Sequence, residues 1–257
     1  MTDDISATTE ANRVSWNQIA SRRHGNPADF YRDNGVSLED FELELAGDVT
    51  GRRVLQLACS DGDEVLSWAN LGATAVGIDI SDVAIESAKR KAADAAIAAD
   101  FRQADIFDLP GDLTEFDLIY FSWGAICWAP DLAEFARIVA RRLRRGGAVL
   151  MSEHHPMWEV LAVQADNQLA VKGNYFGRGT PAAVQDDSKR PIGARGEAYA
   201  PSFLAFVWPV SDVVMAFIGA GLRLDAFVEA PEPAIYDGLG ETASALPAYY
   251  VIKATKL

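Results

Sequence analysis

Residues 53–80 read RVLQLACSDGDEVLSWANLGATAVGIDI, and this stretch decides the fold. Arg53–Ala58 and Thr74–Ile80 are short, continuous apolar runs, which are typical of strands buried on both faces. Between them we interpret Asp63–Leu71 as a helix. A strand, a helix and a second strand in this order predict two parallel strands joined by a crossover helix.

The same alternation continues toward the C-terminus. It predicts helices at 81–99, with Ser81 as the N-cap, and at 131–144, ending at Gly146-Gly147. It predicts strands at 101–104, 116–122 and 148–153. After a helix at 211–220, strands at 222–228 and 249–254 follow without a helix between them, so we expect a terminal antiparallel hairpin. The pattern indicates an α/β fold whose mostly parallel sheet is covered on both faces.

The N-terminal part does not follow this alternation. Residues 1–10 are polar and predict a loose end, and residues 11–23 predict a helix. Residues 37–46 predict a second helix, with Ser37 as the N-cap and Asp40 in a capping box.

Composition and charge limit the classes of function. The chain has 257 residues and 49% hydrophobic residues, which is ordinary for a globular protein. Its 23 Lys and Arg against 37 Asp and Glu give a net charge of −14, which repels nucleic acid and favours cationic ligands. Cys59 and Cys127 stand in apolar surroundings and predict buried thiols, and no metal-ligand spacing is visible. No apolar run is long enough to span a bilayer and no signal pattern is present, so we expect a cytoplasmic protein with a small-molecule partner and no membrane or nucleic-acid partner.

Ligands of open α/β sheets bind beyond the carboxyl ends of the strands, so the residues there are the candidates for a site. The first strand is followed by small residues, Ala58 to Gly62, which let a ligand approach the backbone or simply form a tight turn. Asp79 ends the second strand, where it is placed to accept hydrogen bonds from ribose hydroxyls or to cap the next helix. Asp105 and the apolar residues after it are suited to an adenine ring, and the aromatic residues after 121 either line a pocket or belong to the core.

Together these segments resemble the class I S-adenosylmethionine-dependent methyltransferases. Residues 54–81 are similar to the first two motifs of that family, QADIFDLP to its adenine motif, FDLIYFSW to its fourth-strand motif and LRRGGAVLMSEHHP to its fifth-strand motif. NRVSWNQIA, DFYRDNG, SWGAICWAPDL and AGLRL also resemble a bacterial subgroup that acts on small molecules. The resemblance covers residues 50–155 firmly and the C-terminal hairpin loosely. It implies a Rossmann-like sheet of seven strands.

The resemblance also implies roles for individual residues toward the cofactor, S-adenosylmethionine. Small residues after the first strand would approach its methionine part, Asp79 would hold the ribose and Asp105 the adenine. Trp16 and Tyr31 would close over the cofactor, or alternatively pack within a lid helix. The full set of implied cofactor residues is Trp16, Tyr31, Ala58, Cys59, Ser60, Gly62, Asp79, Ile80, Asp105, Ile106, Phe121, Ser122 and Trp123.

The sequence departs from the family pattern at two places. The first motif of the family carries three glycines at alternate positions, but here Ala58 and Ser60 replace the first two and only Gly62 remains. In the similar subgroup a histidine commonly stands two residues after Trp208, where this chain has Val210.

Two histidines are the candidates for a general base. His154 and His155 follow the fifth strand, and a histidine titrates near neutral pH. At least one of them is expected to be structural instead, and we favour His154 as the base. Glu153 is a candidate to orient an imidazole or to bind a substrate amine, or else it is a solvated strand end.

Residues 156–206 form a long segment rich in Gly, Pro and Asp, and a segment of this length usually carries a function. If it folds over the site, its aromatic residues form a substrate wall. The alternative is a minor hydrophobic cluster. The candidates are Tyr175, Phe176, Tyr199, Phe203 and Trp208.

We therefore expect one domain over residues 1–257. It would consist of an N-terminal helical lid (1–47), a cofactor-binding core (48–155), a substrate-side insertion (156–206) and a C-terminal helix and hairpin (207–257). The expected reaction is methyl transfer from S-adenosylmethionine to a small molecule with an aromatic or apolar part. The alternatives are a cyclase, hydroxylase or isomerase that keeps the cofactor as a structural element, and a binding protein that has lost the cofactor.

Overall fold

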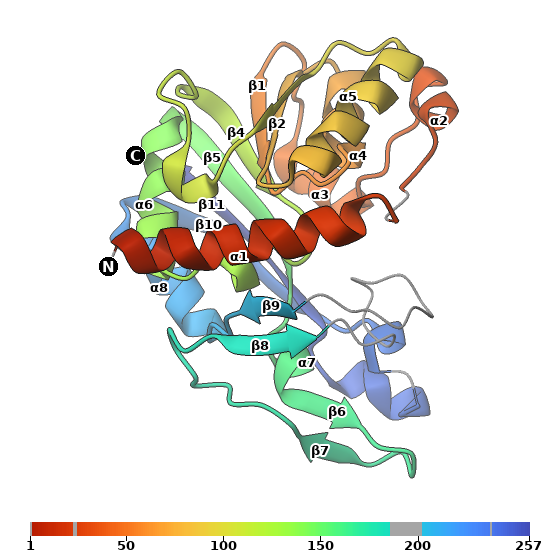
Figure 1. Cartoon of the computed structure of the whole chain (residues 1–257), viewed down its shortest axis with the longest axis vertical. Coiled ribbons are helices and arrows are strands. Elements are labelled where there is room, and N and C mark those ends of the chain that lie inside the picture. Colours follow the sequence, from red (N-terminus) through yellow and green to blue (C-terminus); the bar gives the residue numbers. More distant parts are fainter. Residues whose placement is uncertain (1, 23–24, 186–201, 237) are drawn as a thin grey trace.

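A computed structural model of the chain describes residues 2–22, 25–185, 202–236 and 238–257. One seven-stranded sheet has the strand order β10-β11-β5-β4-β1-β2-β3 (Figure 1). These strands are β1 (Arg53–Leu57), β2 (Thr74–Asp79), β3 (Asp100–Gln103), β4 (Phe116–Phe121), β5 (Leu143–His154), β10 (Leu222–Ala230) and β11 (Tyr249–Lys256).

The pairing agrees with the predicted fold class. Strands β3, β2, β1, β4 and β5 run parallel to one another, and β11 runs antiparallel to both β5 and β10. The predicted Rossmann-like sheet with a C-terminal antiparallel pair is therefore confirmed. In the β5–β11 ladder Tyr249 lies opposite His154, which brings the start of β11 to the carboxyl end of the parallel strands.

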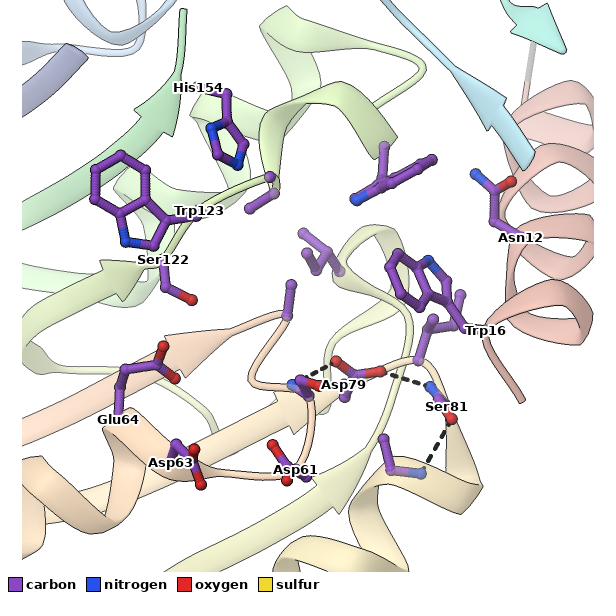
Figure 2. A pocket seen from close by; sticks show the side chains of 18 of the residues that line it. Asn12, Trp16, Asp61, Asp63, Glu64, Asp79, Ser81, Ser122, Trp123 and His154 are labelled. Carbon is purple, nitrogen blue, oxygen red and sulfur yellow. Dashed lines mark hydrogen bonds between the residues drawn. The ribbon is translucent and has the colours of Figure 1, made fainter. Parts of the chain in front are cut away.

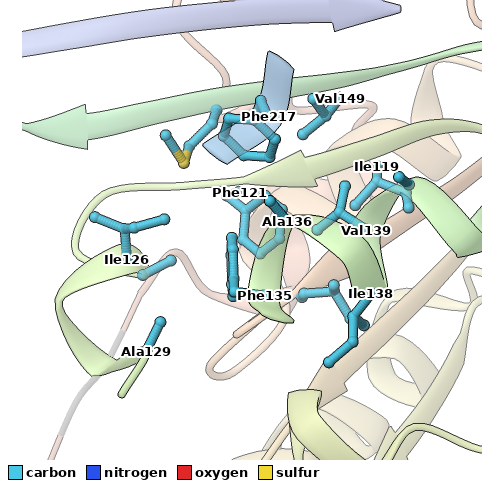
Figure 3. Packing of buried hydrophobic residues seen from close by; sticks show 14 of the residues in the cluster. Ile119, Phe121, Ile126, Ala129, Phe135, Ala136, Ile138, Val139, Val149 and Phe217 are labelled. Atoms are coloured by element: carbon cyan, nitrogen blue, oxygen red, sulfur yellow. The ribbon is translucent and has the colours of Figure 1, made fainter. Parts of the chain in front are cut away.

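Helices cover both faces of the sheet. On one face α6 (Leu132–Arg142) and α8 (Val210–Gly219) pack against β4 and β5, with Phe135 and Phe217 in the core (Figure 3). On the other face the core is made by α2 (Ala28–Arg32), α3 (Asp40–Ala46), α4 (Asp63–Asn70) and α5 (Asp82–Ala95).

The N-terminal segment differs from the prediction. Helix α1 (Thr2–Ala20) begins within the region that we expected to be a loose end. Its polar side chains bond within the helix and to other elements: Thr8 donates to the carbonyl of Asp4 and Asn12 donates to the carbonyl of Leu204. Tertiary contacts outweigh the low hydrophobicity of this segment.

Two other helix ends were also predicted wrongly. The N-cap of α3 is Glu39, not Ser37, and Glu39 forms a reciprocal capping box with Glu42, while Ser37 bonds to Ser67. Helix α6 ends at Arg142, and the two glycines lie within β5. A Cβ on Gly147 would lie 2.5 Å from the carbonyl oxygen of Phe116, so the strand pairing itself requires this glycine.

The segment 156–206 contains short elements in its described part. They are helix α7 (Met157–Val160), the hairpin of β6 (Leu161–Val163) and β7 (Leu169–Val171), and the pair β8 (Ala182–Gln185) and β9 (Ser202–Ala205). Short 3₁₀ turns occur at Ile106–Asp108, Ile126–Trp128, Pro233–Tyr236 and Gly240–Ala245.

Candidate functional site

A cavity of about 810 Å³ lies at the carboxyl ends of the parallel strands, and α1 contributes to its wall (Figure 2). Its volume is within the range of small-molecule sites. Many of the predicted residues meet in it: Trp16, Ala58, Ser60, Asp79, Ile80, Asp105, Ile106, Ser122, Trp123 and His154.

Asp79 lies at the floor of this cavity. One of its carboxylate oxygens accepts the backbone N–H of Ser60 at 2.8 Å, and the other accepts that of Ser81 at 2.8 Å (Figure 2). The hydroxyl of Ser81 in turn accepts the N–H of Ala84 as the N-cap of α5. Asp79 therefore joins the turn after β1 to the turn after β2, and its carboxylate faces the cavity.

The turn after β1 has an unusual backbone. Ala58 and Ser60 line the cavity with φ angles of 58° and 49°, which lie in the left-handed region that favours glycine. Gly62 has a φ of 87° at the start of α4, and a Cβ there would meet the ring of Phe101 at 2.7 Å. The chain thus forms a glycine-type turn with two residues that are not glycine.

The residues after β3 form the next part of the wall. Asp105 caps the 3₁₀ turn by accepting the N–H of Phe107 at 2.9 Å, and Ile106 packs beside it with Ile80 on the cavity. A carboxylate with apolar neighbours is placed here as the sequence predicted.

Sequence reasoning missed an acidic group at the other side of the turn. Asp61 and Asp63 both line the cavity, and Lys91 forms ion pairs with both, at 2.7 Å with Asp61. Asp63 also accepts the N–H of Asn26 at 2.9 Å. A Cβ on Gly25 would overlap the Asp63 carboxylate at 1.8 Å, so this carboxylate fixes the segment that follows α1.

Helix α1 brings Trp16 to the cavity. Its ring packs against Trp128, with centroids 5.3 Å apart, and against the buried ring of Phe203, 4.9 Å away. Asn12 also lines the cavity and exchanges two hydrogen bonds with the backbone of Leu204 on β9. Phe203 therefore packs against Trp16 of α1 and does not form part of the lining.

The two predicted catalytic histidines have different positions. His154 lines the cavity, packs between Trp123 and Trp158, and has a pKa lowered to about 4 by burial. Its Nδ1 is buried and has no hydrogen-bond partner. His155 is buried outside the cavity lining, where its Nε2 contacts Glu229 at 3.1 Å and its Nδ1 accepts the N–H of Met157.

Glu153 is neither a solvated strand end nor part of the cavity lining. It is buried, and its two carboxylate oxygens accept the N–H groups of Gly124, Ala125, Ile126 and His154 at 2.7–2.8 Å. Burial raises the pKa of Glu153 to about 7 against the opposing effect of these four donors. Its carboxylate positions the loop after β4, which carries Trp123.

Four of the predicted cofactor residues lie away from the lining. Tyr31 is fully buried beside Asn26 and Ser37, and Phe121 packs on Phe135 in the core. The thiol of Cys59 is buried, which raises its pKa. The fourth is Gly62, which acts through its backbone turn.

The predicted substrate wall is also placed differently. Phe176 is exposed, the hydroxyl of Tyr175 accepts the N–H of Val210, and Trp208 donates to the carbonyl of Ala129. None of these three lines the cavity, because their segment packs against the start of α8 and the loop after β4. Tyr199 lies outside the described residues.

The aromatic wall is formed instead by residues of other segments. Phe41 of α3 stacks on Tyr249 of β11 with centroids 5.7 Å apart, and Tyr249 meets Trp123 edge-to-face at 5.1 Å. All three line the cavity. Only Trp123 follows a strand end in the sequence, so the other two carried no motif that would have identified them.

Among the described residues, no helix is long and apolar enough to cross a membrane. No group of three His, Cys, Asp or Glu among these residues is arranged to hold a metal ion. Neither Cys59 nor Cys127 takes part in a disulfide within the described part of the chain.

Comparison with known proteins gives consistent similarities. Residues 54–147 match the family model described as a methyltransferase domain. A ubiquinone biosynthesis O-methyltransferase of Alkalilimnicola ehrlichii is 28% identical over 142 residues, covering 53% of this chain and 57% of that protein. The chain spans about half the length of the curated relatives that it matches.

Solved structures extend the similarity of fold to most of the chain. An S-adenosylmethionine-dependent methyltransferase from Mesorhizobium loti has a TM-score of 0.62 at 21% identity, covering 84% of this chain and 96% of that one. The [4+2]-cyclase SpnF has a TM-score of 0.56 at 17% identity, covering 84% and 78%. At these identities the likeness concerns the fold.

Proposed function

We propose that this chain transfers a methyl group from S-adenosylmethionine to a small-molecule acceptor, because residues 54–147 match a methyltransferase-domain model and the fold is similar to that of solved S-adenosylmethionine-dependent methyltransferases. One observation carries the proposal: a single cavity brings together Asp79, Asp105, the turn at Ala58–Ser60, Trp123 and His154.

The side chains of the cavity suit this cofactor. S-adenosylmethionine supplies a methyl group on a positively charged sulfur and carries an ammonium group, and seven carboxylates line the cavity. They are Glu39, Asp61, Asp63, Glu64, Asp79, Asp105 and Glu232. The left-handed turn at Ala58 and Ser60 lets a ligand approach the backbone. The carboxylate of Asp79 would accept hydrogen bonds from the ribose hydroxyls.

The residues of the chain would act mainly by alignment. Methyl transfer is an in-line displacement, so the nucleophile has to be held on the far side of the methyl carbon and water has to be excluded. Trp123, fixed through the Glu153 loop, and Trp16 on α1 form opposite sides of the cavity (Figure 2).

In this proposal His154 takes a proton from the nucleophile. With a pKa of about 4 its imidazole is neutral at pH 7, and because Nδ1 is buried, we assign the accepting role to Nε2. Such a weak base takes the proton as the new bond to carbon forms, since the nucleophile becomes acidic at that stage.

Calorimetric titration with S-adenosylmethionine and S-adenosylhomocysteine tests the cofactor site first. We expect binding to both, weakened by Asp79→Asn by about 1–3 kcal/mol because ribose hydroxyls lose an ionised acceptor. Asp94→Asn, an exposed carboxylate on α5, is the matched control and should bind as the wild type does. Absence of binding by the wild-type protein would contradict the proposal and favour a binding protein for other ligands.

Acceptor screening by mass spectrometry tests the reaction itself. With any acceptor that yields S-adenosylhomocysteine, His154→Gln should lower kcat by about 10²–10⁴-fold and leave cofactor affinity unchanged. His155→Gln should keep its turnover, because that ring lies outside the cavity. Equal turnover of the His154→Gln variant and the wild type would remove the role of His154.

A second candidate is a reaction other than methyl transfer with the cofactor retained. Two observations favour this candidate. Ala58 and Ser60 replace two glycines of the motif, and the fold is similar to that of a cyclase. Such a reaction would convert its substrate only when the cofactor is bound, and it would release no S-adenosylhomocysteine.

A further inference from the structure

The end of the cavity beside His154 has an aromatic wall, which we define as Phe41, Trp123 and Tyr249. Their centroids lie 5.1–6.3 Å apart, and they come from α3, the loop after β4 and the start of β11. Tyr249 is the ladder partner of His154, and directly opposed residues of antiparallel strands place their side chains on the same side of the sheet. The aromatic wall and the proposed proton acceptor therefore border the same space.

Two carboxylates stand beside this wall. Glu39 is the N-cap of α3, two residues before Phe41, and Glu232 lies in the connection between β10 and β11. Both line the cavity, and both add to the effect of burial in raising the pKa of Tyr249. Glu39, Glu232 and Tyr249 thus come from different elements and line the same cavity.

Neither carboxylate is neutralised within the described part of the chain. Each accepts a nearby backbone N–H, from Glu42 for Glu39 and from Ala234 for Glu232, but neither takes part in an ion pair there. Arg22 is the one lysine or arginine among the described residues of the lining. The acceptor end thus combines aromatic faces with uncompensated negative charge.

We propose, on the basis of the methyl-transfer function above, that the acceptor carries a cationic amine next to a flat or apolar part. Aromatic faces attract cations through the ring quadrupole, and the carboxylates add a direct electrostatic attraction. Glu39 and Glu232 hold the ammonium group against the aromatic wall, which leaves the nucleophile near His154. The same charges repel an acceptor whose only ionic group is a carboxylate or phosphate.

Three probes of one shape test this assignment. They are 2-phenylethylamine, 2-phenylethanol and 3-phenylpropanoate, titrated at pH 7.5 into the full chain saturated with S-adenosylhomocysteine. We expect the amine to bind at least 10-fold more tightly than the alcohol and the carboxylate to bind most weakly. Raising the salt concentration should reduce the preference, because part of it is electrostatic at a solvent-exposed site.

Variants then test which side chains cause the preference for the amine over the alcohol. Glu232→Gln should lower the affinity for the amine about 3–10-fold and leave that for the alcohol unchanged, and Glu39→Gln should do the same. Because Glu39 caps α3 and Glu232 accepts the N–H of Ala234 at the start of a 3₁₀ turn, both variants are compared at equal folded fraction. Glu44→Gln and Glu241→Gln remove exposed glutamates outside the cavity and should change nothing.

The order of measurements separates this inference from the function on which it rests. If the chain fails to bind S-adenosylhomocysteine, the proposed function fails. If it binds the cofactor product but binds the amine and the alcohol equally, prefers the carboxylate or binds none of the three, the cationic acceptor is overturned alone. A preference that survives both glutamate variants would also overturn it.

Discussion

Ala58 and Ser60 show how far a single position can be predicted. Their small size indicated correctly that the turn after β1 allows a close approach, since both line the cavity. Sequence alone did not reveal that both adopt the left-handed backbone conformation. The hydrogen bond from the Ser60 N–H to Asp79 helps to hold this conformation. The carboxylate of Asp79 therefore keeps the backbone of the turn in a strained conformation.

Because these two residues are strained, we expect glycine at either position to stabilise the folded chain. Ala58→Gly and Ser60→Gly should each raise the free energy of unfolding by about 1 kcal/mol, because glycine adopts positive φ without a Cβ clash. Chemical denaturation measures the change.

Ala96 provides the matched control, since it has a φ of 58° at the end of α5, away from the cavity. Ala96→Gly should give a similar gain without any change in cofactor affinity. A loss of stability in all three variants would show that these backbones are not strained.

The lowered pKa of His154 predicts a pH dependence of stability opposite in sign to that of a histidine paired with a carboxylate. Its folded value of about 4 lies below its usual value of 6.5, so between these pH values the unfolded chain binds more protons than the folded one. The contribution of His154 to stability is therefore complete above pH 6.5 and is lost as the pH falls toward 4.

Nitrogen chemical shifts of the imidazole measure this directly. The ring of His154, assigned with the His154→Gln variant, should remain neutral from pH 8 down to pH 5.5. Titration near pH 6.5 would mean that water reaches the ring, and would remove the physical basis for its low pKa.

Among single residues, strand-end positions were predictable and buried polar positions were not. Asp79 and His154 are the last residues of β2 and β5, and both line the cavity. Glu153 has the same kind of position, but the alternating direction of side chains along β5 points it to the loop after β4. Phe41 and Tyr249 reach the cavity only through tertiary packing, for which a local pattern gives no information.

At the scale of elements, α1 is held over the cavity by side chains on one of its faces. Asn17 donates to Asp82 at 2.7 Å and accepts from Ser81 at 2.6 Å, at the start of α5. Asn12 makes its two hydrogen bonds with β9. Helix α1 is therefore attached at two points, one at the start of α5 and one on β9.

Removing one attachment should loosen the lid. Asn17→Ala should speed dissociation of S-adenosylhomocysteine and weaken its binding about 3–10-fold, because α1 loses two hydrogen bonds of roughly 1 kcal/mol each. Stopped-flow fluorescence of Trp16 follows the dissociation. Gln18→Ala, on the exposed face of the same helix, is the control; an identical effect there would mean that helix propensity and not the attachment matters.

The elements of the sheet were predictable because each strand is a short apolar run. Predicted strand limits differ from the observed ones by one or two residues at most ends, with β5 the exception because its first residues continue directly from α6. The start of α1 and the strands within 156–206 were not predicted. Their residues are polar or irregularly spaced, and contacts with other segments decide their structure.

At the scale of the whole molecule, cofactor binding should stabilise the fold. A ligand at 100 times its Kd contributes about 2.7 kcal/mol, which for a chain of this size raises Tm by roughly 5–10 °C. Thermal scans with S-adenosylhomocysteine measure the rise. At the same concentration the rise should be smaller for Asp79→Asn and unchanged for Asp94→Asn, and equal rises in both variants would contradict the assigned role of Asp79.

The fold class was recognisable from the sequence, and the observed sheet and the solved structures of similar fold confirm it. The expected methyltransferase family and cofactor agree with the match of residues 54–147 to a methyltransferase-domain model. The net charge of −14 indicated a preference for cationic ligands but not where the charges would gather. Seven carboxylates of the cavity come from segments between residues 39 and 232, and only the folded chain brings them together.

The separation of the two ends of the cavity has a consequence for evolution and engineering. The proposed cofactor end is built from the turns after β1, β2 and β3, whereas Glu39, Phe41, Glu232 and Tyr249 at the proposed acceptor end come from α3 and from the chain around β11. If the two proposals hold, mutations at these four positions should change substrate choice and leave the methyl donor site unaltered. A combinatorial library restricted to these positions would then explore new acceptors on one inherited donor site.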